Sequence, residues 1–227
     1  RLIASKDASE RMPKDGDPLP ADQVALIKKW IEQGAKFDSP DQAALLVSIV
    51  PKKAHAAPPE SYRVPVAVTA LALSPNGQEV AVGGYHEVTI WNVAKGELLR
   101  RIKPLEERTY GLAYNADGSS LVAAGGTPGQ SGEVVLLDPA KATIVKSLGT
   151  MSDVAFGAAF NTAGTKVAAC AADRSIRIYD VASGKEERLI EDHADWVMGI
   201  AWNPEGTQLA SASRDKTSKV FDVKTGD

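Results

Sequence analysis

The stretch NPEGTQLASASRDKTSKVFD, residues 203–222, joins a turn, an apolar segment, a second turn and a short segment that ends in an aromatic residue and an acid. The same order occurs four times along the chain. The turn glycines are spaced 41, 46 and 42 residues apart, at Gly77, Gly118, Gly164 and Gly206. The paired residues that end each unit are Trp91-Asn92, Leu137-Asp138, Tyr179-Asp180 and Phe221-Asp222. Such phased repetition indicates one supersecondary unit repeated four times.

Within each unit the pattern is one of short β segments separated by turn residues. In the third unit it predicts strands over residues 154–161, 166–172, 176–181 and 187–192. A four-stranded antiparallel unit with a period of about 42 residues is typical of a propeller blade. The fold class is therefore predicted as mainly β, a partial β-propeller of about four blades over residues 67–107, 108–150, 151–192 and 193–227, with a short N-terminal helical segment. The last blade lacks its outer strand.

The fourth unit resembles a WD40 repeat, from His193-Ala-Asp-Trp-Val through Asn203-Pro-Glu-Gly to Val220-Phe221-Asp222. The resemblance covers residues 68–227 and implies a propeller that closes with further blades after Asp227. In that family a buried polar tetrad bridges the strands of each blade. The positions that match it are His193, Ser211, Ser213 and Asp215, with Asp173 in the third unit. Phe221 replaces the usual tryptophan. Residues 62–66 are a candidate for the outer strand that completes the final blade.

The first 66 residues differ from the repeats. Residues 21–34 predict a helix, because Val24, Ile27 and Ile31 fall on one face. Residues 1–37 resemble the C-terminal part of a planctomycete-type cytochrome c domain, in the motif Glu10-Arg-Met12-Pro13 and in Trp30-Ile-Glu-Gln-Gly-Ala35. The resemblance implies that Met12 is the distal haem ligand in an intact parent protein, whose haem-attachment half lies upstream of Arg1. It also implies a periplasmic location. Residues 38–66 read as a Pro-rich linker.

Composition narrows the function. The chain has 26 Lys and Arg against 29 Asp and Glu, a net charge of −3, and neither end carries a basic patch. Nucleic-acid binding is therefore not expected. The longest apolar run, residues 43–50, is far shorter than the roughly 20 residues of a membrane helix. The single cysteine, Cys170, excludes an internal disulfide and a C-x-x-C-H haem site within these residues. It is expected to be a small, inert, buried residue, and we expect no cofactor in this chain.

Several residue patterns suggest a catalytic or ligand-binding site, but the surrounding sequence argues against each of them. His193 with Ser213 suggests a hydrolase, but no G-x-S-x-G motif is present. The glycine-rich segment 125–132 suggests a phosphate loop, but it lacks the Gly-Lys-Ser/Thr ending and a following helix, which favours a flexible hairpin loop on the rim. The three histidines, His55, His86 and His193, share no ligand spacing, so the sequence predicts no zinc site.

The remaining hypothesis is a non-enzymatic scaffold that binds a protein partner. Exposed arginines and aromatic residues next to the turns on one propeller face are the residue types that dominate binding energy. The candidates are Tyr85, His86, Arg174, Trp196 and Arg214. The alternative is electron transfer by a cytochrome c fusion, in which the propeller orients the haem domain.

Overall fold

The computed structural model describes residues 2–5, 7, 9, 12, 17–36 and 55–227. Contacts divide the chain into two units, Arg1–Pro51 and Lys52–Asp227, and each is described by itself. We call the second one the β unit. The linker expected over residues 38–66 crosses this division, and its part before residue 55 lies outside the described residues. The domain boundaries therefore stay predictions.

The first unit contains a 3₁₀ turn, η1 (Leu2–Ala4), and one helix, α1 (Ala21–Glu32). The helix predicted over residues 21–34 is confirmed. It ends before Gly34, whose φ of 92° suits glycine at the end of a helix. α1 buries none of its side chains, and Leu26 and Trp30 are 69% and 48% exposed. Among the described residues, no helix has the length and apolar character needed to cross a membrane.

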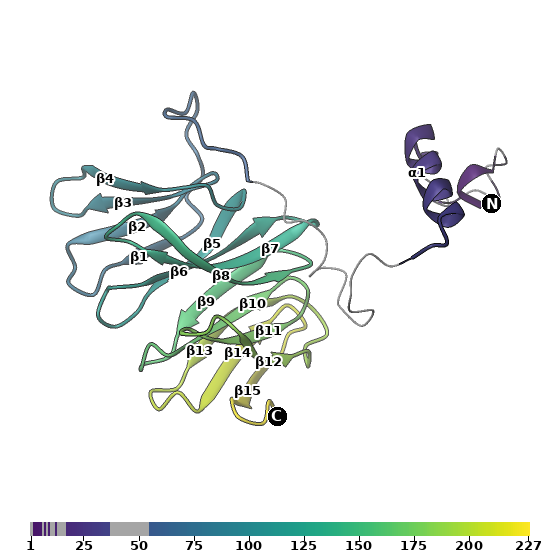
Figure 1. Cartoon of the computed structure of the whole chain (residues 1–227). Helices are drawn as coiled ribbons and strands as arrows, with labels where there is room; N and C mark the ends of the chain where they lie inside the picture. Colours follow the sequence, from purple (N-terminus) through teal and green to yellow (C-terminus); the bar gives the residue numbers. More distant parts are fainter. Residues whose placement is uncertain (1, 6, 8, 10–11, 13–16, 37–54) are drawn as a thin grey trace. The chain divides into compact units, whose positions relative to one another are not determined.

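The β unit contains four antiparallel sheets that follow one another along the chain (Figure 1). Three sheets have four strands in sequential order, and the last has three, which confirms the predicted fold class and the missing outer strand. The strands are β1 (Leu71–Leu73), β2 (Glu79–Gly83), β3 (Val88–Asn92), β4 (Leu98–Ile102), β5 (Arg108–Tyr114), β6 (Leu121–Thr127), β7 (Ser131–Asp138), β8 (Thr143–Met151), β9 (Ala155–Phe160), β10 (Lys166–Ala171), β11 (Ile176–Asp180), β12 (Glu186–Ile190), β13 (Val197–Trp202), β14 (Gln208–Ser213) and β15 (Ser218–Asp222).

The turn between the first and second strands of each sheet explains the repeated sequence around its glycine. Its first residue accepts a backbone N–H bond from five residues later, as in Ser120 N to Asn115 Oδ1 at 2.9 Å and Gln208 N to Asn203 Oδ1 at 2.8 Å. The glycines have positive φ, for example 67° at Gly206, a conformation that other residues adopt only with strain. A short polar residue and a glycine three positions later are therefore required by the same turn.

The acid or amide of each paired residue caps the next turn, between the third and fourth strands. Asn92 Oδ1 accepts the N–H of Lys95 at 2.8 Å, and Asp180 Oδ1 accepts that of Ser183 at 2.7 Å. Asp138 and Asp222 do the same in their sheets. The paired residue is thus repeated because its side chain closes a turn. The residue before it packs in an apolar cluster in three of the sheets, at Leu137, Tyr179 and Phe221.

Three apolar clusters join neighbouring sheets face to face. One joins the first two sheets around Ile90 and Leu121, one joins the second and third around Val122 and Tyr179, and one joins the third and fourth around Ile178. The last cluster includes Cys170, which is fully buried as expected. Burial raises the pKa of its thiol to about 12, so the sulfur stays protonated and unreactive at neutral pH.

The glycine-rich segment 125–132 is not a flexible loop on the rim, as the sequence suggested. Gly125 and Gly126 lie in β6 and Gly132 lies in β7, so the two strands extend to a tight turn at residues 128–130. The physical reason is close backbone approach. A Cβ on Gly132 would collide with the carbonyl oxygen of Asp153, which follows β8. Because glycine has no side chain, the second sheet can pack closely against the segment that leads into the third.

We predict that Gly132→Ala lowers the free energy of unfolding by about 2–3 kcal/mol, because the added methyl meets backbone atoms that cannot rotate away. Gly199→Ala in β13 is the matched control, since a Cβ there meets no atom within 4 Å. It is expected to change stability by less than about 0.5 kcal/mol. Urea unfolding curves measure both. Equal effects for the two variants would show that the close approach at Gly132 is not present.

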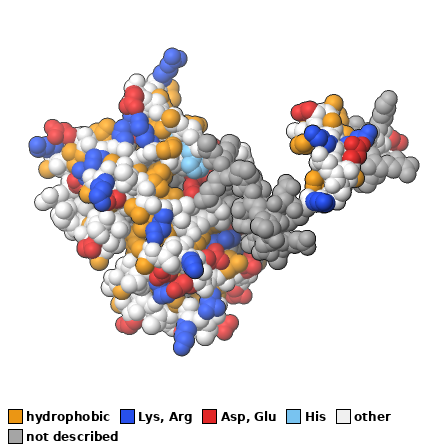
Figure 2. All heavy atoms as spheres, in the orientation of Figure 1, with side chains coloured by type: hydrophobic (Ala, Val, Ile, Leu, Met, Phe, Trp, Pro, Cys, Tyr) orange, Lys and Arg blue, Asp and Glu red, His pale blue; other side chains and the backbone are white. Residues whose placement is uncertain are grey.

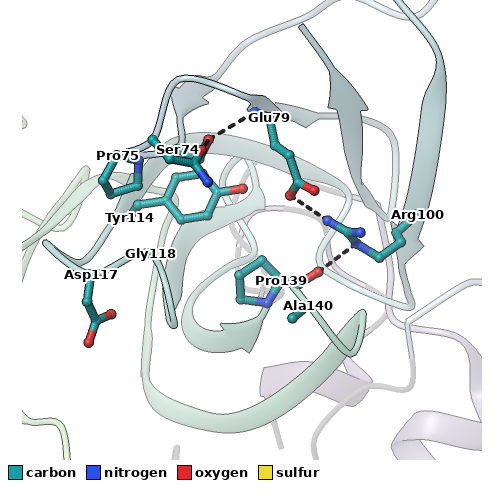
Figure 3. Close-up of a pocket in the computed structure, with 10 residues that line it drawn as sticks. Ser74, Pro75, Glu79, Arg100, Tyr114, Asp117, Gly118, Pro139 and Ala140 are labelled. Atoms are coloured by element: carbon teal, nitrogen blue, oxygen red, sulfur yellow. Dashed lines mark hydrogen bonds and ion pairs between the residues drawn. The ribbon is translucent and has the colours of Figure 1, made fainter.

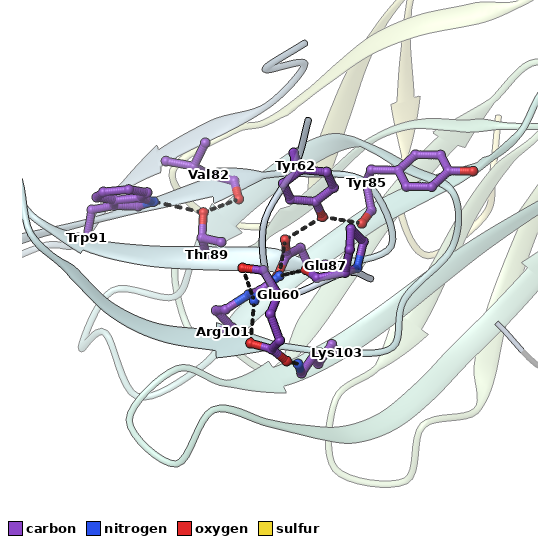
Figure 4. Close-up of polar contacts among 10 residues, drawn as sticks. Glu60, Tyr62, Val82, Tyr85, Glu87, Thr89, Trp91, Arg101 and Lys103 are labelled. Carbon is purple, nitrogen blue, oxygen red and sulfur yellow. Dashed lines mark hydrogen bonds and ion pairs between the residues drawn. The ribbon is translucent and has the colours of Figure 1, made fainter. Parts of the chain in front are cut away.

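The segment before β1 is held against the first sheet by a buried charge network (Figure 4). The Glu87 side chain is 2% exposed and accepts bonds from Arg101 Nε at 2.6 Å and from the Tyr62 hydroxyl at 2.6 Å. Arg101 also donates to Glu60 and to the Pro59 carbonyl. Burial and the bond to Glu87 raise the pKa of Tyr62 to about 12.

The suggestion that residues 62–66 form the outer strand of the final blade stays a prediction, because the last sheet of the described residues, β13–β15, is the fourth blade and not that final one. These residues lie in no strand, and Tyr62 binds the first sheet, where its hydroxyl also donates to the Tyr85 carbonyl at 3.0 Å. The reason is local. Tyr62 and Glu60 satisfy the polar groups of the Glu87–Arg101 pair, which fixes the segment on the first sheet.

Candidate functional site: the loop face

The connections between the second and third strands of each sheet meet the segments that join successive sheets. In the first sheet, His86 N donates to Glu107 O at 3.1 Å, and Leu105 N donates to His86 O at 2.9 Å. In the fourth, Arg214 N donates to Trp196 O at 2.9 Å. We call this end of the strands the loop face and the opposite end the turn face. The loop face comprises residues 84–87, 103–107, 128–130, 152–154, 172–175, 191–196 and 214–217.

Trp196 and Arg214 form an exposed contact on the loop face. The Arg214 guanidinium carbon lies 4.7 Å from the centre of the Trp196 ring, and its Nε lies 3.6 Å from Asp195 Oδ2. Trp196 is 38% exposed although its ring contacts that of Phe156, with ring centres 5.6 Å apart and the planes tilted by 43°. Phe156 in turn meets Tyr110 at 6.0 Å. The structure thus brings two of the predicted residues together at the end of an aromatic row.

The row itself was not predicted from sequence. Tyr110 and Phe156 occupy equivalent positions in β5 and β9, each directly before a glycine, Gly111 or Gly157. That shared position is the signal that could have identified them. A cation over an aromatic face and edge-to-face or tilted ring contacts are individually weak but fix the side chains in place. The row therefore presents a rigid apolar surface next to a charge.

The other three predicted residues lie apart from this row, at Tyr85, His86 and Arg174. Tyr85 and His86 contact each other at 4.4 Å between ring centres, and His86 Nδ1 lies 3.0 Å from the Leu105 carbonyl oxygen. His86 therefore holds two loops together. Arg174 is exposed at the tip of its own loop, with a φ of 72°. Among the described contacts, none joins Arg174 to the other four predicted residues.

His193, Ser211 and Asp215 form a closed polar network, as the WD40 resemblance implied. His193 Nδ1 lies 2.7 Å from Asp215 Oδ2, and Nε2 lies 2.7 Å from Ser211 Oγ. Since a carboxylate only accepts, Nδ1 carries a proton, and Nε2 shares a hydrogen bond with the Ser211 hydroxyl. Phe221, which cannot donate, packs its ring edge-on to the imidazole at 6.2 Å.

Thr217 is a member of this network that sequence reasoning missed. Its hydroxyl donates to Asp215 Oδ1 at 2.6 Å, and it contributes most to holding the pKa of Asp215 well below its usual range. The bond from His193 and the backbone N–H of Ala194 act in the same direction. Asp215 therefore stays charged and tied to three partners at all ordinary pH values.

Ser213 and Asp173 are placed outside the histidine network. Ser213 Oγ donates to the Asp195 carbonyl at 3.0 Å and accepts from Asp215 N, while Ser211 is the serine on the imidazole. The His193–Ser213 pair of the hydrolase hypothesis is therefore wrong. His193 and Ser211 are 3% and 4% exposed, which leaves no access for a substrate. Asp173 accepts from Ser175 and pairs with Arg177 within the third sheet.

A pocket of about 240 Å³ opens on the turn face between the first two sheets (Figure 3). The Arg100–Glu79 ion pair and the Pro139 carbonyl form one wall, and Tyr114 forms another. The Tyr114 hydroxyl is buried and has no hydrogen-bond partner in the structure. The pocket is lined mainly by polar groups, and it could not be predicted from the sequence because its residues come from three turns and three strands.

The visible surface of the β unit carries Lys, Arg, Asp and Glu side chains interspersed (Figure 2). No large patch of one sign is visible on that face, which agrees with the near balance of 26 basic and 29 acidic residues. Met12, in the first unit, is 48% exposed. The residues on either side of it, 11 and 13, lie outside the described residues.

Residues 144–180 and 184–222 match the family described as WD domain, G-beta repeat. Each match starts in or just before the outer strand of one sheet and runs through three strands of the next, β8 to β11 and then β12 to β15. The sequence repeat is thus offset by one strand from the sheets, so each repeat links two neighbours. The chain carries WD40 repeats, and such repeats suggest a protein-interaction scaffold. A search of curated proteins found no match.

Proposed function

We propose that the chain is a non-enzymatic scaffold that binds a protein partner on the loop face, centred on Trp196 and Arg214. The observation that carries the proposal is the exposure of this contact at the end of the Tyr110–Phe156–Trp196 row. Trp and Arg are the residues most enriched among those that dominate interface energy. Because neighbouring rings already hold the Trp196 ring in place, binding would cost little side-chain entropy.

The stacked sheets support this role. Loops anchored at both ends by buried strands can carry variable side chains without loss of the fold. Arg174 lies on the next loop along the face and would extend the contact, while Tyr85 and His86 would form a further edge. The pairing of Arg214 with Asp195 at 3.6 Å is long, so an acidic group of the partner can compete for this guanidinium.

Affinity capture from an extract of the source cells tests the proposal. We expect Trp196→Ala and Arg214→Ala each to weaken capture of the partner at least tenfold, as expected for central interface residues. Glu205→Ala, on the exposed turn face of the same sheet, is the control and should retain full binding. Loss of binding with Glu205→Ala, together with normal binding by the Trp196 and Arg214 variants, would contradict the proposal.

We also propose that residues 1–37 are the C-terminal part of a cytochrome c-like domain in a longer electron-transfer protein. The exposed apolar side chains of α1 support this, since a helix normally buries such a stripe against another element. The residues present do not hold a haem by themselves, because one ligand candidate, Met12, and a single cysteine are not enough. A haem group, when bound in the parent, would supply one-electron chemistry.

The absorption spectrum of the full-length protein tests this second proposal. A haem spectrum that loses its methionine-ligand features in Met12→Ala, with the haem still attached, is the expected result. Lys29→Ala, on the same unit, is the control and should leave the spectrum unchanged. A full-length protein without haem, or a spectrum indifferent to Met12, would contradict it.

A further inference from the structure

Three side chains that are distant in sequence converge beside the second sheet. His55 precedes the first sheet, Glu106 lies between β4 and β5, and Glu133 lies on β7. His55 Nε2 lies 3.2 Å from Glu133 Oε2, and Nδ1 lies 3.9 Å from Glu106 Oε2. One ligand atom from each residue can be chosen so that all three lie within 4.8 Å of one another.

The two carboxylates are held in place by the fold. Glu106 accepts a bond through Oε1 from Ser131 Oγ at 2.9 Å, which leaves Oε2 directed at His55. Glu133 stands opposite Gly125 in the β6–β7 register, and glycine has no side chain. Glu106, Glu133 and Gly125 line a cavity of about 10 Å³, the size of a single water or ion. The Glu106 and Glu133 side chains are 14% and 11% exposed.

The donor set is the one that divalent transition metals prefer. An imidazole and two carboxylates bind Zn²⁺ with metal–ligand distances of about 2.1 Å, which places the ligand atoms about 3.4 Å apart in a tetrahedral site. One ring nitrogen can bind a given ion, and with that choice the three ligand atoms lie within 4.8 Å of one another, so rotation of the side chains would bring them to this spacing. The two carboxylates carry the charge opposite to that of a divalent cation, which favours a cation over an anion among these donors.

We propose that His55, Glu106 and Glu133 form a binding site for one divalent transition-metal ion of the Zn²⁺ type, with water completing the coordination. Either ring nitrogen can serve, because Nε2 faces Glu133 and Nδ1 faces Glu106. The metal fastens the segment that begins at His55 to the loop-face end of the second sheet. The site does not depend on the partner surface proposed above. The competing interpretation is an ion-pair clip in which the imidazolium alone bridges the two glutamates.

Zinc titration of the metal-free full chain, in competition with a chromophoric chelator, distinguishes a metal site from an ion-pair clip. We expect one equivalent of Zn²⁺ to bind, and His55→Gln, Glu106→Gln and Glu133→Gln each to weaken binding at least tenfold. Glu205→Gln is the matched control, since it makes the same substitution on the exposed turn face of the fourth sheet, and it should bind zinc normally.

Cobalt provides a second readout that does not rest on affinity. Co²⁺ in the chain should give visible absorption bands of a low-coordinate site with nitrogen and oxygen ligands, and these bands should be absent from His55→Gln. Far-UV circular dichroism of each variant confirms that it is folded. Zinc binding that is equally tight in the wild type and in folded His55→Gln and Glu133→Gln would overturn the proposal, as would a wild type that binds no zinc.

Discussion

Arg101→Ala should lower the free energy of unfolding of the β unit by about 3–5 kcal/mol, because it leaves a charged group buried without its cation. The side chain of Glu87 is 2% exposed, and both of its oxygens accept bonds from Arg101, at 2.6 and 2.9 Å. The same bonds raise the pKa of the Arg101 guanidinium. Without Arg101, Glu87 keeps the Tyr62 hydroxyl as a donor but no compensating charge.

Arg100→Ala, on the neighbouring residue of the same strand, is the matched control. Arg100 pairs with Glu79, and both side chains are 28% exposed, so water can solvate the glutamate that remains. We expect a cost of about 1 kcal/mol or less. Urea unfolding of both variants at neutral pH measures the difference. Equal costs would show that Glu87 is hydrated and that the network does not hold the segment before β1.

His193→Ala is expected to cost about 2–4 kcal/mol. It removes a fully buried ring, leaves Ser211 without its hydrogen-bond partner on that ring, and opens a cavity beside Phe221. Asp215 loses one partner but keeps Thr217 and the Ala194 N–H. The effect therefore comes mainly from packing and from the buried hydroxyl.

Ser213→Ala is the control for this prediction, because the Ser213 hydroxyl bonds only backbone groups, the Asp195 carbonyl and the Asp215 N–H, and does not contact the His193 ring. It should cost about 1 kcal/mol. Thermal unfolding of the two variants under identical conditions compares them. If His193→Ala costs no more than Ser213→Ala, the closed network does not stabilise the fourth sheet.

The sequence predicted the fold well because each repeat carries its own local signals. A residue that caps a turn and a glycine with positive φ act over five residues, so a reader can place the turns without the structure. The third sheet illustrates this, since all four strands predicted over residues 154–192 are present with ends within two residues. The helix over residues 21–34 was readable from its apolar spacing for the same reason.

Contacts between residues that are far apart in the sequence could not be predicted from it. The extension of β6 and β7 depends on how closely Gly132 approaches Asp153 in the next sheet. The grouping of His55 with Glu133 spans 78 residues and no spacing rule connects them. The hydrogen bond from the Tyr62 hydroxyl to Glu87 spans 25 residues, and no repeat signal in the sequence predicts it. Side chains that meet across sheets need the register and the stacking, which a single sequence does not supply.

Photo-cross-linking tests the central claim, that the WD40 repeats present their loop face to a protein partner. A photo-reactive amino acid is placed in the third sheet either at Arg174, on the loop face, or at Ala163, on the turn face, both of which are exposed. Irradiation in the presence of a source-cell extract should give a specific adduct from position 174 and none from position 163. An adduct from position 163 alone would place the partner on the turn face and contradict the account.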